Sequence, residues 1–127
     1  MKLTITRRVI TKKNSKRFIT RGRKKFLVPS VAFENYLDEA AFELRPQVRE
    51  KLTGLVRVHC DFYIKGKYRV DGDNLFTSIL DTLQHVGAIE DDNNVMAGSW
   101  EKHLNNSDWK TIILLTPFRG KNARAIH

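Results

Sequence analysis

One stretch of the chain alternates apolar and polar residues more regularly than any other. Every second position between residues 55 and 64 is apolar: Val56, Val58, Cys60, Phe62 and Ile64. A period of two is typical of a strand with one buried face, so we predict a strand over residues 55–64. Cys60 belongs to the apolar set and is predicted to fill the core, whereas His59 is predicted to lie on the strand surface.

Shorter alternating stretches near both ends of the chain predict further strands. Residues 3–10 are rich in β-branched side chains and are expected to form the first strand, with its apolar residues facing inward. Toward the C-terminus we predict a short strand near Val95 and two longer strands, over residues 99–104 and 109–116. A polar turn at residues 105–108 separates the last two, and we expect them to pair as a hairpin.

Apolar residues at helical spacing predict two main helices. The first begins after Ser30, a suitable N-cap, and carries acidic residues on its polar face. Pro46 interrupts this pattern, which indicates a kink or a short second helix that ends near Leu52. The second main helix is predicted over residues 74–86, with Gly87 as its C-cap.

The order of these elements indicates the fold class. Strand, helix, strand, helix, strand, strand predicts an α/β (α+β) fold, a mixed β-sheet of about four strands with two main helices packed on it. The 127 residues suit a single domain, residues 1–127. The sequence has no apolar run of membrane-spanning length and no signal-peptide pattern, so we expect a cytoplasmic protein without a membrane partner.

The formal net charge of +9 is unevenly distributed. Residues 1–30 contain eleven Lys and Arg and no Asp or Glu. A basic loop is expected at about residues 11–25, with Phe18 and Phe26 anchoring it to the body. Clustered cations bind phosphates, which makes nucleic acid the leading partner. The alternative is a basic arm that only keeps the chain soluble or steers association.

A purely acidic segment follows in this basic chain. Residues 71–99 contain no Lys or Arg, but they include six carboxylates: Asp71, Asp73, Asp81, Glu90, Asp91 and Asp92. Neighbouring carboxylates repel each other unless a cation neutralises them, and oxygen ligands suit Mg²⁺ or Mn²⁺. In an extended approach Asp71 and Asp73 point the same way, and we expect Asp91 and Asp92 to meet them at one helix mouth. Helix caps, a turn and a solvated loop are the alternative explanations.

Several motifs in this region resemble the RusA-type Holliday junction resolvases. They are residues 71–74 (DGDN), 79–83 (ILDTL) and 87–92 (GAIEDD) together with Val95, and Asn14-Ser15 is similar to the N-terminal loop of that family. The resemblance implies that Asp71, Asp73 and Asp92 are the catalytic metal-binding residues, with Asp91 as an additional metal ligand. The family usually has Lys one helical turn after the second aspartate, where this chain has Thr77.

The resemblance also implies an activity and partners. It implies a homodimer that binds four-way DNA junctions and nicks two opposed strands with Mg²⁺ (or Mn²⁺). No small-molecule cofactor is expected. Proteins of this family are frequent in phages and prophages, so we expect a phage or prophage origin. The metal would activate water for attack on the phosphodiester. The candidate nucleic-acid-binding residues are Lys12, Lys13, Asn14, Lys16, Arg17, Arg21, Arg23, Lys67 and Arg69. The alternative is a non-catalytic junction- or nucleic-acid-binding protein, in which Thr77 marks impaired cleavage.

Four further side chains are interpreted as structural. They lack metal-ligand spacing or fit strand positions that pack on helices: His85, His103, Trp100 and Trp109. Lys65, Lys67 and Arg69 precede Asp71 and are candidates for the charge that the family's usual Lys supplies.

Overall fold

The computed structural model describes residues 1–12 and 16–119. Within these residues the elements are β1 (Lys2–Ile5), β2 (Lys16–Arg21), β3 (Lys24–Pro29), α1 (Val31–Leu44), the 3₁₀ helix η1 (Arg45–Gln47), β4 (Val56–Lys65), α2 (Gly72–Val86), the 3₁₀ helix η2 (Asp92–Asn94), β5 (Val95–Asn106) and β6 (Lys110–Pro117). Four strands form a mixed sheet in the order β1-β6-β4-β5, and β2 and β3 form a separate two-stranded sheet. The predicted fold class is therefore confirmed.

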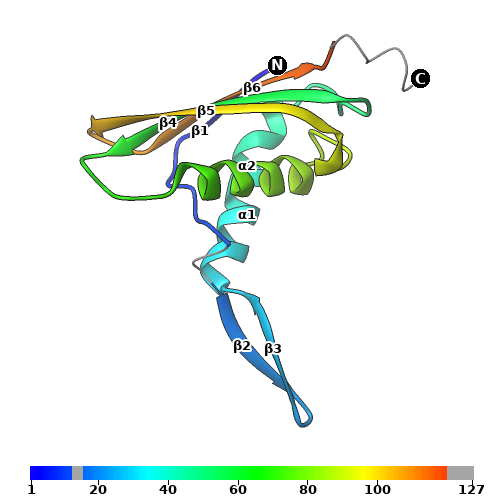
Figure 1. Ribbon diagram of the computed structural model, residues 1–127, viewed down its shortest axis with the longest axis vertical. Coiled ribbons are helices and arrows are strands. Elements are labelled where there is room, and N and C mark those ends of the chain that lie inside the picture. The colour runs from blue at the N-terminus through cyan, green and yellow to red at the C-terminus, as the bar shows by residue number, and fades with distance from the viewer. Residues whose placement is uncertain (13–15, 120–127) are drawn as a thin grey trace.

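Both helices cover one face of the four-stranded sheet (Figure 1). Strand β4 has the predicted alternation, because the side chains from Val56 to Ile64 at every second position are buried against the helices. Cys60 is fully buried among them, as expected. The largest fully buried side chains of the core include Leu3, Ile5, Leu44, Phe62, Ile79, Leu83, Ile113 and Leu115.

The predicted hairpin of the last two strands is wrong. β5 is one continuous strand that pairs parallel to β4, and β6 pairs antiparallel to the other edge of β4. The helix between β4 and β5 makes the parallel pairing possible. β6 lies inside the sheet, between β1 and β4, and its Ile113 and Leu115 are fully buried. β5 lies at an edge of the sheet, and every one of its residues keeps some exposure.

The first strand is shorter than the predicted residues 3–10. β1 ends at Ile5, and the chain then turns toward α1. The backbone N–H and the hydroxyl of Thr6 both donate hydrogen bonds to the Glu43 carboxylate, which draws the chain off the sheet. Val9 is nevertheless buried in the core, as the alternation indicated.

The basic segment is a β-hairpin from residue 16 onward, not the predicted loop. β2 and β3 pair antiparallel, and Gly22 in the turn has a φ of 64°, a conformation that glycine adopts without strain. The hairpin projects away from the four-stranded sheet, beyond the end of α1 (Figure 1). The basic side chains of this segment are thus carried on an arm.

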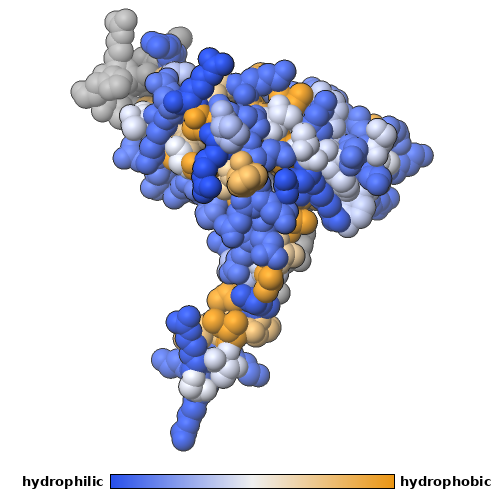
Figure 2. All heavy atoms as spheres, turned by 180° about the vertical axis from the view of Figure 1, so that it is seen from behind, coloured by the Kyte–Doolittle hydropathy of each residue, from blue (hydrophilic) through white to orange (hydrophobic). Residues whose placement is uncertain are grey.

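The expectation that Phe18 and Phe26 anchor this segment to the body is also wrong. Phe18 is 72% exposed and Phe26 is 43% exposed. Each aromatic residue lies opposite an aliphatic one on the partner strand, Phe18 opposite Leu27 and Phe26 opposite Ile19, so each pair shares one face of the hairpin. Figure 2 shows a hydrophobic surface near the base of the arm.

The start of α1 and the interruption at Pro46 agree with the sequence patterns. The Ser30 hydroxyl accepts a hydrogen bond of 3.1 Å from the Phe33 N–H, which caps the helix. After Leu44 the chain forms only the short η1, so the second short helix ends earlier than the predicted Leu52. Of the helices in the described ranges, none has the length and apolar content needed to cross a membrane.

Candidate functional site

Asp71 and Asp73 lie side by side at the beginning of α2. Oδ1 of Asp71 accepts hydrogen bonds from the backbone N–H groups of Asp73 (2.8 Å) and Asn74 (3.3 Å), so Asp71 is the N-cap. Because of this cap, the helix starts at Gly72, two residues earlier than predicted. Asp73 therefore lies in the first turn of the helix and not in the extended segment that was expected to carry both aspartates. Both carboxylates are exposed at the end of the helix dipole that favours negative charge.

Trp100 reaches Asp73 from the middle of β5. Its indole Nε1 donates a hydrogen bond of 3.0 Å to Oδ1 of Asp73. The same indole covers Gly72 so closely that a Cβ there would lie 2.3 Å from the ring. Trp100 was interpreted as structural from the sequence, and the structure shows that it also positions a candidate metal ligand.

Asp91 and Asp92 lie toward the opposite end of α2. Asp91 caps η2 by accepting a hydrogen bond of 2.8 Å from the Asn93 N–H, and the Asp92 N–H donates one of 3.3 Å to Oε1 of Gln84. Gln84 belongs to the last turn of α2, so Asp91 and Asp92 do not meet Asp71 and Asp73 at one helix mouth. Within the described part of the chain, these carboxylates form no group of three whose ligand atoms lie within 4.8 Å.

Asp81 is the neighbour of Asp92. Burial raises the pKa of the Asp81 carboxyl, with Lys12 opposing this effect and the negative charge of Asp92 adding to it. Eight residues of helix separate Asp81 from Asp73, about 12 Å at 1.5 Å per residue. The acidic segment therefore provides two groups of carboxylates, Asp71 and Asp73 at the start of α2 and Asp81, Asp91 and Asp92 toward its other end.

The pair at the start of α2 has the donor chemistry of a site for a hard cation. Asp71 and Asp73 make the contacts described above through Oδ1, so Oδ2 of each is the atom that would hold an ion. Among the residues that the structure describes, no Lys or Arg side chain lies within 4.0 Å of either carboxylate. Exposed oxygen ligands without a cationic partner fit Mg²⁺ or Mn²⁺.

Cationic side chains surround the segment that precedes Asp71. Nζ of Lys102 donates a hydrogen bond of 2.9 Å to the Val70 carbonyl. Arg8 and Arg69 line a pocket of about 330 Å³ that also includes Val70. Arg69 was among the predicted nucleic-acid-binding residues, whereas Arg8 and Lys102 were missed because they come from distant parts of the chain and reach Val70 only through the fold.

The other predicted basic residues are spread over the arm and the loops. Arg21 and Arg23 are exposed near the tip of the β2–β3 hairpin, and Arg17 forms an ion pair of 3.5 Å with Glu34 of α1. Lys12 and Lys67 are exposed in the segments that precede β2 and follow β4. Lys13, Asn14 and the side chain of Lys16 lie outside the described residues.

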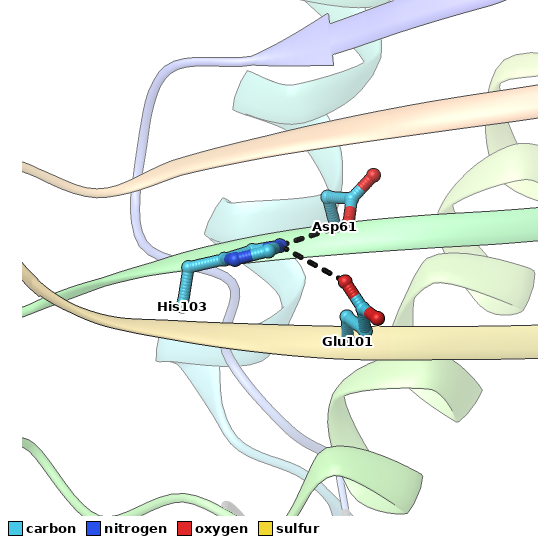
Figure 3. A group of neighbouring side chains, drawn as sticks. All are labelled: Asp61, Glu101 and His103. Atoms are coloured by element: carbon cyan, nitrogen blue, oxygen red, sulfur yellow. Dashed lines mark hydrogen bonds and ion pairs between the residues drawn. The ribbon is translucent and has the colours of Figure 1, made fainter.

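A second group of ionisable side chains lies on the other face of the sheet, where β4 and β5 run side by side (Figure 3). Asp61, Glu101 and His103 place one ligand atom each within 4.8 Å of the others. Nε2 of His103 lies 2.9 Å from Oδ1 of Asp61 and 3.6 Å from Oε2 of Glu101. A hydrogen bond from His103 lowers the pKa of Asp61, and the nearby His59 lowers it further.

Sequence reasoning missed this group. The alternation did indicate that His59, Asp61 and Tyr63 share the polar face of their strand. The partners on β5 follow from the parallel register, which pairs Asp61 with Glu101 and Tyr63 with His103. No local sequence pattern predicts the pairing register of β4 and β5, so His103 could not be assigned to this group from the sequence.

Comparison with known protein families identifies the chain. A family model described as Endodeoxyribonuclease RusA matches residues 7–115. The chain belongs to this family. The match covers nearly the whole chain, which confirms the resemblance drawn from residues 71–95 and indicates an endodeoxyribonuclease of a family that acts on branched DNA junctions. No curated protein sequence gives a match.

Proposed function

We propose that this RusA-family protein is a Mg²⁺-dependent endonuclease that resolves four-way DNA junctions by paired nicks. The observation that carries the proposal is the pair of exposed carboxylates, Asp71 and Asp73, at the start of α2 in a chain that belongs to a nuclease family. Mn²⁺ has the same preference for oxygen ligands and is expected to replace Mg²⁺.

The protein's own residues hold and orient the site. A bound Mg²⁺ ion would lower the pKa of a water molecule and stabilise the leaving oxygen of the phosphodiester. Asp71 and Asp73 would hold the ion, and Trp100 fixes the direction of the Asp73 carboxylate through the hydrogen bond to Oδ1. Lys102, held against Val70, provides positive charge next to the phosphate that is cleaved.

The third carboxylate of the proposed site belongs to a different end of the helix. The family resemblance assigns Asp92, preceded by Asp91, as a further ligand, yet Asp92 lies beside Gln84 in the last turn of α2. In a twofold dimer, the start of α2 in one copy and the 91–92 segment of the other would together supply the three carboxylates. We therefore include a site shared between two copies in the proposal.

The basic residues supply DNA affinity from two regions. Arg8, Arg69 and Lys102 surround the segment before Asp71, and Arg21 and Arg23 lie on the projecting arm (Figure 1). Contacts to phosphates position DNA without reading its sequence. Two separated basic regions per chain suit a branched substrate, whose arms leave the cleavage point in different directions.

The decisive experiment separates the charge of Asp71 from its capping role. Asparagine caps helices as well as aspartate does, so Asp71→Asn keeps the fold but removes a metal ligand. We expect Mg²⁺-dependent nicking of a four-way junction to be abolished, while junction binding in EDTA is retained or improved because a negative charge near the phosphates is gone. The same result is expected for Asp73→Asn.

Asp38→Asn is the matched control, because Asp38 is an exposed helical aspartate that pairs only with His85 in the described contacts. Undiminished turnover in Asp71→Asn and Asp73→Asn would contradict the metal assignment. A wild-type protein that binds junctions in EDTA but does not nick them after Mg²⁺ is added would instead identify a non-catalytic junction-binding protein.

A further inference from the structure

The group formed by Asp61, Glu101 and His103 is separate from the nuclease site. Trp100 and Lys102 of β5 face α2 and the Asp71 segment, and Glu101 and His103 alternate with them on the opposite face of the sheet. Asp61 lies on the same outer face of β4, next to Glu101 in the parallel register. The three side chains therefore face solvent on a surface that neither helix covers.

Two of the three ligand-atom distances in this group are close to those of a metal coordination sphere, and all three lie within 4.8 Å. Two ligands of a tetrahedral Zn²⁺ ion, each bonded at 2.0–2.1 Å, lie about 3.3 Å apart. Nε2 of His103 is 2.9 Å from Oδ1 of Asp61 and 3.6 Å from Oε2 of Glu101, values on either side of that separation. Small side-chain rotations thus suffice to place an ion between the three atoms.

Neighbouring side chains hold two of the three ligands in place. The His103 ring stacks on Tyr63, with centroids 4.7 Å apart and planes inclined by 17°. The other oxygen of Asp61, Oδ2, lies 3.4 Å from Nε2 of His59, whose Nδ1 is bonded to the Ser99 hydroxyl at 2.6 Å. Such outer contacts orient metal ligands and raise metal affinity, because less freedom is lost on binding.

The donor set indicates which ions the site prefers. One imidazole nitrogen and two carboxylate oxygens favour a first-row transition metal such as Zn²⁺ over Mg²⁺, which prefers oxygen ligands. Glu101 has a side chain that is 69% exposed, so the site is open to solvent. Three protein ligands and an open fourth position are typical of sites that also bind water or an anionic group.

We infer that Asp61, Glu101 and His103 form a second metal site, which binds a divalent transition-metal ion such as Zn²⁺ on the outer face of the sheet. His59 is a positioning residue for this site, because it contacts Asp61 and not the other two ligands in the group. This inference goes beyond the proposed function, and it does not depend on Asp71 or Asp73.

Calorimetric titration of the full chain with Zn²⁺ tests the inference, and the absorption spectrum of bound Co²⁺ reports the coordination. We expect one Zn²⁺ ion per chain in a buffer with excess Mg²⁺, which occupies the carboxylates at the start of α2. His103→Gln and Glu101→Gln are each expected to weaken binding by at least about 10-fold. Glu101 is largely exposed, so Glu101→Gln leaves the fold intact even if a change at His103 disturbs its stacking with Tyr63.

Two controls distinguish this site from other zinc-binding positions. His85→Gln removes a histidine that also contacts one carboxylate, Asp38 at 3.2 Å, without a third ligand in the described contacts, and should leave Zn²⁺ binding unchanged. Asp73→Asn should likewise keep Zn²⁺ binding while it abolishes Mg²⁺-dependent nicking. Absence of Zn²⁺ binding in the wild type would overturn the inference. So would Zn²⁺ binding as tight as that of the wild type in both Glu101→Gln and His103→Gln. Either result would leave only a hydrogen-bonded network between two strands.

Discussion

The Trp100 indole and the Asp73 carboxylate are joined by a hydrogen bond of 3.0 Å, although 27 residues separate them in the chain. The bond connects the middle of β5 to the first turn of α2, where Gly72 leaves room for the indole ring. A single side chain therefore packs the helix against the sheet and orients a proposed metal ligand. The two roles are experimentally separable, because the bond depends on Nε1 and the packing depends on the ring.

Trp100→Phe removes the hydrogen bond but keeps an aromatic ring between β5 and α2. We expect Mg²⁺-dependent cleavage to fall by about 10- to 100-fold, the usual effect of losing an outer contact to a metal ligand. Junction binding in EDTA should change little, since no charge is altered. Trp109→Phe is the control, because the Trp109 indole contacts Tyr68 and Arg8 rather than a carboxylate. Equal losses in both variants would indicate a general packing effect.

Gly72→Ala is expected to destabilise the protein by about 1–3 kcal/mol, the usual cost of overpacking, although alanine is the better helix former. The added Cβ would lie 2.3 to 2.6 Å from the outer carbons of the Trp100 ring. Phenylalanine at position 100 lacks those carbons, so the double variant should recover part of the loss in urea unfolding. Gly54→Ala, where nothing lies within 4 Å of the new Cβ, should be close to neutral.

Thr77→Lys tests whether a second cation, in addition to Lys102, increases the cleavage rate. The Thr77 hydroxyl donates a hydrogen bond of 3.0 Å to the Asp73 carbonyl, so the residue lies exposed one helical turn beyond Asp73. A lysine there would bring an ammonium group toward the cleaved phosphate, and we expect cleavage to rise by roughly 10-fold. Thr77→Met, similar in length and uncharged, should not show the gain. A slower Thr77→Lys enzyme would indicate that the charge supplied by Lys102 is sufficient for cleavage.

A site shared between two copies predicts that light scattering at micromolar concentration gives the mass of a dimer. It also predicts that two inactive variants restore activity when they are combined in one dimer. Asp73→Asn and Asp92→Asn should each be inactive when assembled alone. A dimer with one copy of each variant has one intact site if the carboxylates come from both chains, so it should nick one strand of the junction but not two. A monomeric mass would contradict the dimer, and failure of the mixed dimer to nick would contradict the shared site.

Cys60 predicts how stability changes at alkaline pH. Burial raises the pKa of its thiol in the folded chain, whereas the unfolded thiol ionises near pH 8.5. The folded state therefore holds its proton longer, and stability that is fully present below about pH 8.5 falls as pH rises further. Cys60→Ala should lower stability at pH 7 but flatten its decline between about pH 8.5 and 10. An unchanged slope in urea-unfolding free energy against pH would contradict this assignment.

Local patterns in the sequence predicted most of the secondary structure, because each depends on neighbouring residues. The alternation over residues 55–64, the cap at Ser30 and the turn at Gly87 all have the geometry expected from their residue types. The start of α2 was displaced by two residues, since either Asp71 or Asp73 is chemically suited to cap a helix. Only the backbone decides which of the two does so.

The sequence by itself determined the fold class, the apolar face of β4 and the concentration of carboxylates between residues 71 and 92. Tertiary structure decided the partners of those carboxylates: Trp100 for Asp73, and Gln84 for the backbone of Asp92. It also decided that β6 lies beside β4 and that His103 joins Asp61. Strand order and register depend on how apolar faces of distant segments are buried against each other. The packing energies that decide between alternative arrangements cannot be inferred from any short stretch of sequence.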